Sequence, residues 1–169
     1  MKKRYAALIF CAIGLLLGSI TSEAKKKPSV TAESAIVMDV QSGAILYEKN
    51  IDKREYPASI TKVMTALVAI ENSSLSETVT YSRNAVTNLE SGASNIEIQP
   101  GEKLSMEDSL YAILLMSANE ACNGVAEHVA GSIDNFVAMM NQKAKELGCT
   151  GTHFANANGL WMSNHYTTA

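Results

Sequence analysis

The chain lacks the motifs of two large hydrolase classes, and it has too few metal ligands to suggest a metalloprotein. Neither a Gly-x-Ser-x-Gly elbow nor a His-Glu-x-x-His pair occurs in its 169 residues. Its three cysteines and three histidines are scattered and do not have the spacing of a zinc site. We therefore expect no metal ion and no organic cofactor, and the sequence does not favour a Ser-His-Asp hydrolase or a zinc peptidase.

The chain also has little concentrated charge. Charged residues make up 18% of the sequence, and the formal net charge at pH 7 is −3. Nucleic-acid-binding proteins usually carry a stripe of basic residues interleaved with aromatic ones. Beyond the first four residues the longest basic run here is Lys25-Lys26-Lys27, which is typical of a solvated linker. We predict no nucleic-acid partner.

The first 24 residues have the composition of a secretory signal peptide. Basic residues at Lys2–Arg4 precede a mostly apolar stretch, Tyr5–Ile20, and Ser22–Ala24 offers small residues for cleavage. The alternative is a retained membrane anchor, but the apolar stretch is shorter than the ~20 residues of a spanning helix. We expect a signal peptide over residues 1–24, a linker over 25–32 and an exported, extracytoplasmic domain over 33–169.

The segment Ser59-Ile60-Thr61-Lys62 is the most informative part of the chain. Pro57 suits the first turn of a helix, and the apolar residues that follow have the spacing of one buried helical face. We expect this face to comprise Ile60, Val63, Met64, Leu67 and Val68.

A serine near a helix N-terminus, with a lysine three residues later on the same face, has the arrangement of an activated nucleophile. The positive end of the helix dipole favours a developing oxyanion and disfavours a protonated Lys62. Burial lowers a lysine pKa further, so a neutral amine can act as the base for Ser59. The pair predicts acyl transfer.

Each short motif also has a simpler explanation. Ser22 and Lys25 repeat the Ser-x-x-Lys pattern, and Ser82-Arg83-Asn84 matches Ser-x-Asn as well as Ser117-Ala118-Asn119 does. Taken alone, Ser59 and Ser117 are better explained as helix-capping residues. The order and context of the motifs decide between the two explanations.

The remaining patterns predict a mixed α and β chain. Apolar residues on both sides of Gly43 predict a two-stranded hairpin over residues 33–48. Capping residues and apolar spacing predict helices over about 105–116, 119–130 and 132–147, and a short strand is expected at 95–98. The helical residues expected to face inward are Leu110, Ile113, Leu114, Phe136, Val137, Met140, Ala144 and Leu147.

Cys122 falls within one of these helical runs, together with Val125 and Val129. An exported context would permit a disulfide with Cys149. Free cysteines are nevertheless often buried, so a buried free thiol is the better explanation of Cys122.

Together, the hairpin, the Ser59–Lys62 segment, Ser117-Ala118-Asn119 and the stretch from Gly148 to Phe154 closely resemble the low-molecular-mass penicillin-binding proteins that act as D-alanyl-D-alanine carboxypeptidases. The resemblance covers residues 31–169 in order. It implies an α+β fold of the serine β-lactamase and penicillin-binding-protein transpeptidase type. It also implies a peptidoglycan stem peptide as substrate and β-lactams as inhibitors.

The resemblance assigns a role to each motif residue. Ser59 is implied to be the acylated nucleophile and Lys62 its general base. Ser117 would relay a proton to the leaving amine, while Asn119 would bind the substrate amide and help to hold Lys62. Asn158 stands where the family often has histidine, so it is expected either to contribute to the substrate-binding pocket or to form an Asn-Gly turn.

The third family motif, Lys-Thr-Gly on an edge strand, is missing from the chain. We expect it in C-terminal strands that this sequence does not include, along with any C-terminal region that associates with the membrane surface. The fragment itself is expected to be inactive. Two alternatives remain: a class A-like β-lactamase, which normally has Ser-Asp-Asn where this chain has Ser117-Ala118-Asn119, and a non-catalytic module that binds muropeptides or β-lactams.

Overall fold

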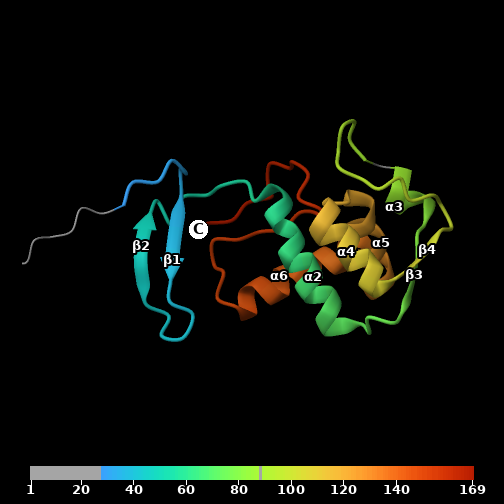
Figure 1. Cartoon of the computed structure of the whole chain (residues 1–169), viewed down its shortest axis with the longest axis horizontal. Coiled ribbons are helices and arrows are strands. Elements are labelled where there is room, and N and C mark those ends of the chain that lie inside the picture. Colours follow the sequence, from blue (N-terminus) through green and yellow to red (C-terminus); the bar gives the residue numbers. More distant parts are fainter. Residues whose placement is uncertain (1–27, 88) are drawn as a thin grey trace, which may run out of the picture. The chain divides into compact units, whose positions relative to one another are not determined.

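The computed structural model describes residues 28–87 and 89–169 (Figure 1). The chain divides into two units, residues 1–31 and residues 32–169. Of the first unit only residues 28–31 are described, and they have no regular secondary structure. The predicted signal peptide therefore lies outside the described residues. Within the described part of the chain, no helix is long and apolar enough to cross a membrane.

The second unit is a mixed α and β structure, as the sequence predicts. Its strands form two separate two-stranded sheets, β1–β2 and β3–β4, and the other regular elements are helices. The elements are β1 Ala35–Met38, β2 Ile45–Lys49, the 3₁₀ helix η1 Ala58–Ile60, α2 Thr61–Asn72, β3 Thr78–Thr80, α3 Arg83–Thr87, β4 Lys103–Ser105, α4 Met106–Met116, α5 Asn119–Ala130 and α6 Ile133–Glu146.

The predicted hairpin is confirmed as the antiparallel pair β1–β2. Ala35 pairs with Lys49, and the register shifts at a bulge between Val37 and Met38. Gly43, with a φ of 71°, allows the tight turn between the strands. No described helix approaches this hairpin closely (Figure 1). Its apolar side chains are therefore left exposed, namely Val37, Met38, Val40, Ile45 and Leu46.

The second sheet consists of two strands that the sequence did not predict, and the strand predicted at 95–98 is absent. Strand β3 pairs antiparallel with β4, with Val79 opposite Leu104, whereas residues 95–98 form an irregular segment. The prediction was wrong because these residues make no ladder with a neighbouring strand. Instead, the Ile96 N–H donates to the Glu120 carboxyl group of α5, and Glu97 takes a left-handed φ of 63°.

Helix α5 is the centre of the core, and α2, α3, α4 and α6 all pack against it. Gly124 of α5 permits a close approach by Tyr81, the residue that follows β3, because a Cβ atom at position 124 would overlap the Tyr81 ring. The largest fully buried apolar side chains are Tyr81, Phe136, Met106, Ile113 and Met140. The inward predictions for Leu114 and Leu147 were wrong, since these side chains are 52% and 58% exposed.

The predicted buried face of α2 was correct in part. Val68 is buried and Met64 and Leu67 are half-buried, but Ile60 and Val63 are exposed, and the other buried residues are Thr61, Lys62, Thr65, Ala66 and Ala69. The reason is that α2 packs against α5 and α6 through small and polar side chains, several of which hydrogen-bond to the segment 154–160. The face with Lys62 therefore points into the protein, and part of the apolar stripe remains exposed.

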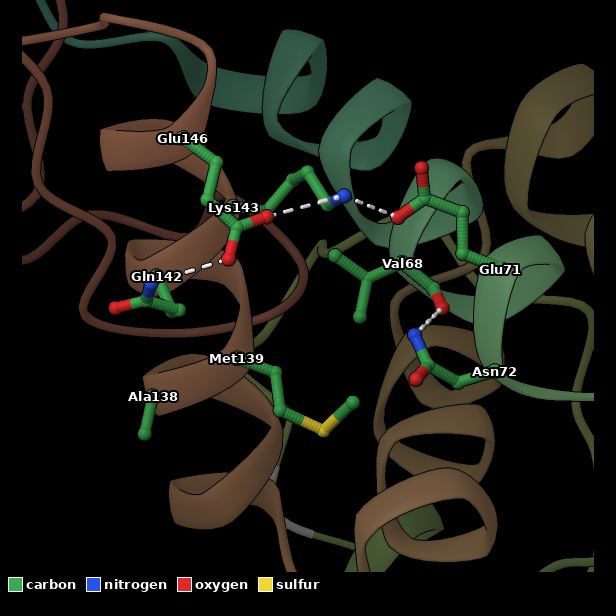
Figure 2. Close-up of a pocket in the computed structure, with 8 residues that line it drawn as sticks. All are labelled: Val68, Glu71, Asn72, Ala138, Met139, Gln142, Lys143 and Glu146. Atoms are coloured by element: carbon green, nitrogen blue, oxygen red, sulfur yellow. Dashed lines mark hydrogen bonds and ion pairs between the residues drawn. The ribbon is translucent and has the colours of Figure 1, made fainter.

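A groove of about 480 Å³ runs between α2 and α6, away from Ser59 (Figure 2). Lys143 of α6 spans it and pairs with Glu71 of α2, Nζ to Oε2 2.6 Å, and with Glu146, Nζ to Oε2 3.3 Å. The other lining residues are Val68, Asn72, Ala138, Met139 and Gln142. Its lysine and glutamate side chains are paired with one another, and neither Ser59 nor Lys62 lines it, so we do not place the candidate catalytic site in this groove.

Candidate active site

Ser59 lies in the single turn of 3₁₀ helix that leads into α2. Pro57 precedes this turn and has a helical φ of −70°, which its ring favours at a helix start. Ala58 has a left-handed φ of 47°, and such strain often occurs at functional sites. Ser59 is exposed, so the start of α2 presents its hydroxyl group to the surrounding cleft.

Lys62 is buried and reaches three oxygen acceptors. Its Nζ donates to Asn158 O at 2.5 Å, to Asn119 Oδ1 at 2.9 Å and to Ser59 Oγ at 3.5 Å. Burial lowers the pKa of Lys62 from its ordinary value, while Cys122 and Glu120 act in the opposite direction. A lysine whose pKa is lowered by burial has a larger neutral fraction, and this neutral amine can accept a proton.

Ser117 faces Ser59 across the cleft. It ends α4 with a left-handed φ of 55°, and the N–H of the next residue, Ala118, donates to Ala112 O at 3.1 Å. The two hydroxyl oxygens are 2.9 Å apart, within hydrogen-bonding distance. A chain of proton-carrying groups therefore runs from Lys62 through Ser59 to Ser117.

The amide of Asn119 connects this group to the segment 91–98. Its Nδ2 donates to Ser94 O at 2.8 Å, and its backbone N–H donates to the same oxygen at 3.0 Å. With Nδ2 held by a carbonyl, Oδ1 faces the Lys62 ammonium or amine group. The reverse orientation would place two acceptors together on one side and two donors together on the other.

The segment 154–160 also binds Lys62, through the Asn158 carbonyl oxygen. Thr65 Oγ1 donates to Ala157 O at 2.6 Å, one residue before the Asn158 carbonyl that accepts from Lys62. The Asn158 side chain bonds within the protein: Oδ1 accepts from Leu160 N–H at 3.0 Å, and Nδ2 donates to Asn123 Oδ1 at 3.3 Å. Asn158 thus contributes its backbone carbonyl to the site.

His165 holds the segment 154–160 to the start of α2. Its Nδ1 accepts from Ala155 N–H at 3.0 Å, so its Nε2 carries the hydrogen and donates to Thr61 Oγ1 at 2.8 Å. Both nitrogens of the neutral ring are therefore used. Burial lowers the pKa of His165, and His153 lowers it further.

We expect this arrangement to make the fold sensitive to acid. The pKa of His165 is lowered in the folded state, whereas the unfolded chain binds a proton near the ordinary value of 6.5. Its contribution to stability is thus complete above that pH and is lost as the pH falls below it. Urea unfolding at about pH 8 and pH 5.5 should show a smaller decrease for His165→Gln than for the wild type. The surface variant His128→Gln serves as control, and an equal decrease in all three proteins would contradict this role.

A cleft of about 360 Å³ lies beside Ser59 and Asn119. Ser59, Asn119 and Asn158 line it together with Gly92, Ala93, Ser94 and the apolar or aromatic residues Tyr56, Leu160, Trp161 and Met162. The aromatic pair Tyr56 and Trp161 lies at 6.3 Å between ring centroids. The cleft thus combines the exposed hydroxyl group of Ser59 with an apolar wall.

The structure brings Ser59–Lys62 and Ser117-Ala118-Asn119 together and gives the other Ser-x-Asn copy another explanation. Ser82 Oγ accepts from Ala85 N–H at 3.0 Å, so it caps α3. Ser22 lies outside the described residues. Cys122 is a buried free thiol, as predicted, and Cys149 is free and exposed. Burial raises the pKa of Cys122 to about 12, so this thiol stays protonated near neutral pH.

Sequence reasoning missed four contributors to the site. These are the backbone carbonyls of Ser94 and Asn158 and the side chains of Thr61 and His165. A carbonyl oxygen leaves no trace in the residue type, so no signal could have located the first two. The histidine could have been noticed only through its spatial partner, which the sequence does not give.

Comparison with known proteins defines the class of the fold. The structure matches the crystal structure of penicillin-binding protein 6B from Escherichia coli with a TM-score of 0.81 and 29% identity, over 88% of this chain and 49% of that one. The D-alanyl-D-alanine carboxypeptidase DacD from Francisella tularensis matches with a TM-score of 0.79 and 36% identity, over 85% of this chain and 35% of that one. The fold is that of the serine transpeptidase domain of penicillin-binding proteins, of which the chain covers a part.

The sequence comparison gives the family. The profile of the D-alanyl-D-alanine carboxypeptidases, peptidase family S11, matches residues 21–169. D-alanyl-D-alanine carboxypeptidase DacF of Bacillus subtilis is 35% identical over 178 aligned positions, which cover 99% of this chain and 45% of the relative. The chain therefore belongs to the D-alanyl-D-alanine carboxypeptidase family. It spans less than half the length of the curated relatives that it matches most strongly.

Proposed function

We propose that the whole protein is a serine-type D-alanyl-D-alanine carboxypeptidase that removes the terminal D-alanine from peptidoglycan stem peptides through a Ser59 acyl-enzyme. The proposal depends above all on one observation. The buried Lys62 Nζ lies 3.5 Å from Ser59 Oγ, which in turn lies 2.9 Å from Ser117 Oγ. Membership of the family supports the choice of substrate.

The geometry supports a two-step reaction. Neutral Lys62 takes the proton of Ser59 as Oγ attacks the carbonyl carbon of the D-alanyl-D-alanine bond. The oxyanion forms at the N-terminal end of η1 and α2, where the helix dipole is favourable. Ser117 relays the proton that Lys62 has taken up to the leaving amine, free D-alanine departs, and a water molecule then hydrolyses the ester and restores the Ser59 hydroxyl group.

The exposed apolar surface supports assigning this activity to the whole protein. The hairpin side chains Val37 and Leu46 and the α2 side chains Ile60 and Val63 are between 52% and 73% exposed. Large apolar side chains that are left exposed in groups often pack against another part of a protein. We propose that the further strands of the domain, which would carry Lys-Thr-Gly, cover these side chains and complete the cleft.

The same proposal extends to location and partners. A domain that acts on peptidoglycan works outside the cytoplasm, so we propose that residues 1–24 direct export and are then removed. β-Lactams mimic the scissile dipeptide in this family and are proposed as covalent inhibitors. Association with the membrane surface would depend on a C-terminal region that the described residues do not contain.

Mass spectrometry of the whole protein after treatment with benzylpenicillin tests the proposal. We expect one adduct, on the peptide that contains Ser59, and none in the Ser59→Ala variant. Slow loss of the adduct is expected of a carboxypeptidase, whereas rapid turnover of penicillin would indicate a β-lactamase. An adduct at another residue, or none on the folded protein, would contradict the assignment, and a bound but unmodified ligand would indicate a non-catalytic module.

A further inference from the structure

Glu120 is a buried acidic residue beside the candidate active site that the proposed mechanism does not use. It lies in the first turn of α5, and only 1% of its surface is exposed. Its neighbours Ala121 and Cys122 are completely buried. Burying a carboxyl group is unfavourable unless it is hydrogen-bonded or placed near positive charge, and the N-terminus of α5 supplies only part of that compensation.

The two carboxyl oxygens of Glu120 have different surroundings. Oε1 accepts a hydrogen bond of 2.6 Å from the N–H of Ile96. Oε2 is buried and has no hydrogen-bond partner among the described residues. A half-satisfied buried acid costs stability, so the Ile96 contact is a stabilising feature of this segment.

The segment that Glu120 holds also supports Asn119. Ser94, two residues before Ile96, accepts from both the backbone N–H and the Nδ2 of Asn119 at 3.0 and 2.8 Å. No strand pairing fixes residues 91–98. Three hydrogen bonds to adjacent residues of α5 therefore attach this segment to the helix, and one of the three holds the amide that contacts Lys62.

We propose that Glu120 is a positioning residue of the Ser59 site. Its carboxyl group fastens the segment 91–98 to the N-terminus of α5, so that the Ser94 carbonyl orients the Asn119 amide with Oδ1 toward Lys62. This inference rests on the proposed function for its catalytic consequence. Its structural part, the contact between Glu120 and Ile96, stands independently.

Glu120 acts on the site in two ways that substitution can separate. It accepts the Ile96 hydrogen bond, and it also raises the pKa of Lys62 against the effect of burial. Cys122 of the same helix also raises the pKa of Lys62. Burial raises the pKa of Tyr81 to about 12, and Glu120 contributes to this increase. Cys122 and Tyr81 both stay unchanged in Glu120→Gln and Glu120→Asp.

Glutamine keeps the length of the side chain and an acceptor oxygen but removes the charge. Glu120→Gln should therefore retain the plateau rate of penicillin acylation. Because the pKa of Lys62 falls when the acid is removed, the acid limb of the rate profile should move to lower pH. Aspartate keeps the charge, but it is one methylene shorter and does not reach the Ile96 N–H. Glu120→Asp should lower the plateau rate about 10- to 10²-fold, as expected for a misplaced catalytic group, with the acid limb near its original pH.

The experiment measures acylation of the whole protein by benzylpenicillin across pH, with hydrogen exchange at the Ile96 amide as the structural readout. Glu127→Gln, on the same helix and bonded to Asn84, is the control and should leave both unchanged. Ile96 should stay protected in Glu120→Gln and lose protection in Glu120→Asp.

Three outcomes are informative. The positioning role would be overturned if Glu120→Asp and Glu120→Gln had equal plateau rates although the Ile96 amide lost its protection from exchange in Glu120→Asp. Unchanged protection in Glu120→Asp would overturn the fastening role. If the wild-type protein is not acylated at Ser59, the proposed function fails, and the exchange measurement still decides whether Glu120 fastens the segment.

Discussion

Replacing Lys62 with arginine should abolish the acylation of Ser59, although it preserves a positive charge. A guanidinium group has a pKa above about 12 and cannot accept a proton near neutral pH. In the wild type, burial lowers the pKa of Lys62, so the amine can act as a base. Loss of general-base catalysis typically costs about 10²–10⁴ in rate, and we expect the benzylpenicillin acylation rate to fall by at least that range.

Lys143→Arg is the matched control. Lys143 makes two ion pairs on the opposite side of α2 (Figure 2), and arginine can keep both. Acylation by this variant should equal that of the wild type. Stopped-flow measurement of both variants, with far-ultraviolet circular dichroism to verify folding, separates lost chemistry from lost structure. If Lys62→Arg is acylated at a near-normal rate, Lys62 is not the base.

The sequence was sufficient to predict the central pair of the site because the pair is local. Ser59 and Lys62 are three residues apart at a helix start, and helix geometry alone places them on one side. The junction between α4 and α5 was equally predictable, since capping signals mark both helix ends. The residue pattern alone therefore places Ser117 at a helix break.

The sequence was not sufficient to predict the path of a segment or the orientation of a helix where these depend on tertiary contacts. Residues 95–98 have a strand-like apolar pattern, but an irregular path results because Glu120 accepts the Ile96 N–H. The buried face of α2 was predicted only in part, because hydrogen bonds to Ala157 and Asn158 turn the side with Lys62 and Thr65 inward. Tertiary contacts of this kind override local propensity, and they are most frequent around the site itself.

Replacing Gly159 with alanine should impair both folding and acylation, because this glycine allows the segment 154–160 to pass close to Ser59. Its φ is 84°, and a Cβ atom here would overlap the carbonyl group of Ala58, the residue before Ser59. Alanine would combine left-handed backbone strain of about 1–2 kcal/mol with an overpacking penalty of ~1–3 kcal/mol. Because the overlap pushes on Ala58, the acylation rate should fall along with the free energy of unfolding.

Gly148→Ala separates these two effects. Gly148 has nearly the same backbone conformation, with a φ of 78°, but a Cβ atom there meets nothing within 4 Å. We expect Gly148→Ala to lose only the ~1–2 kcal/mol of backbone strain and to be acylated at the wild-type rate. Urea unfolding of the whole protein and penicillin acylation of both variants provide the test. If both variants lose the same free energy of unfolding and are acylated at the same rate, backbone strain alone explains the two substitutions. The close approach of Gly159 to Ala58 would then have no part in positioning Ser59.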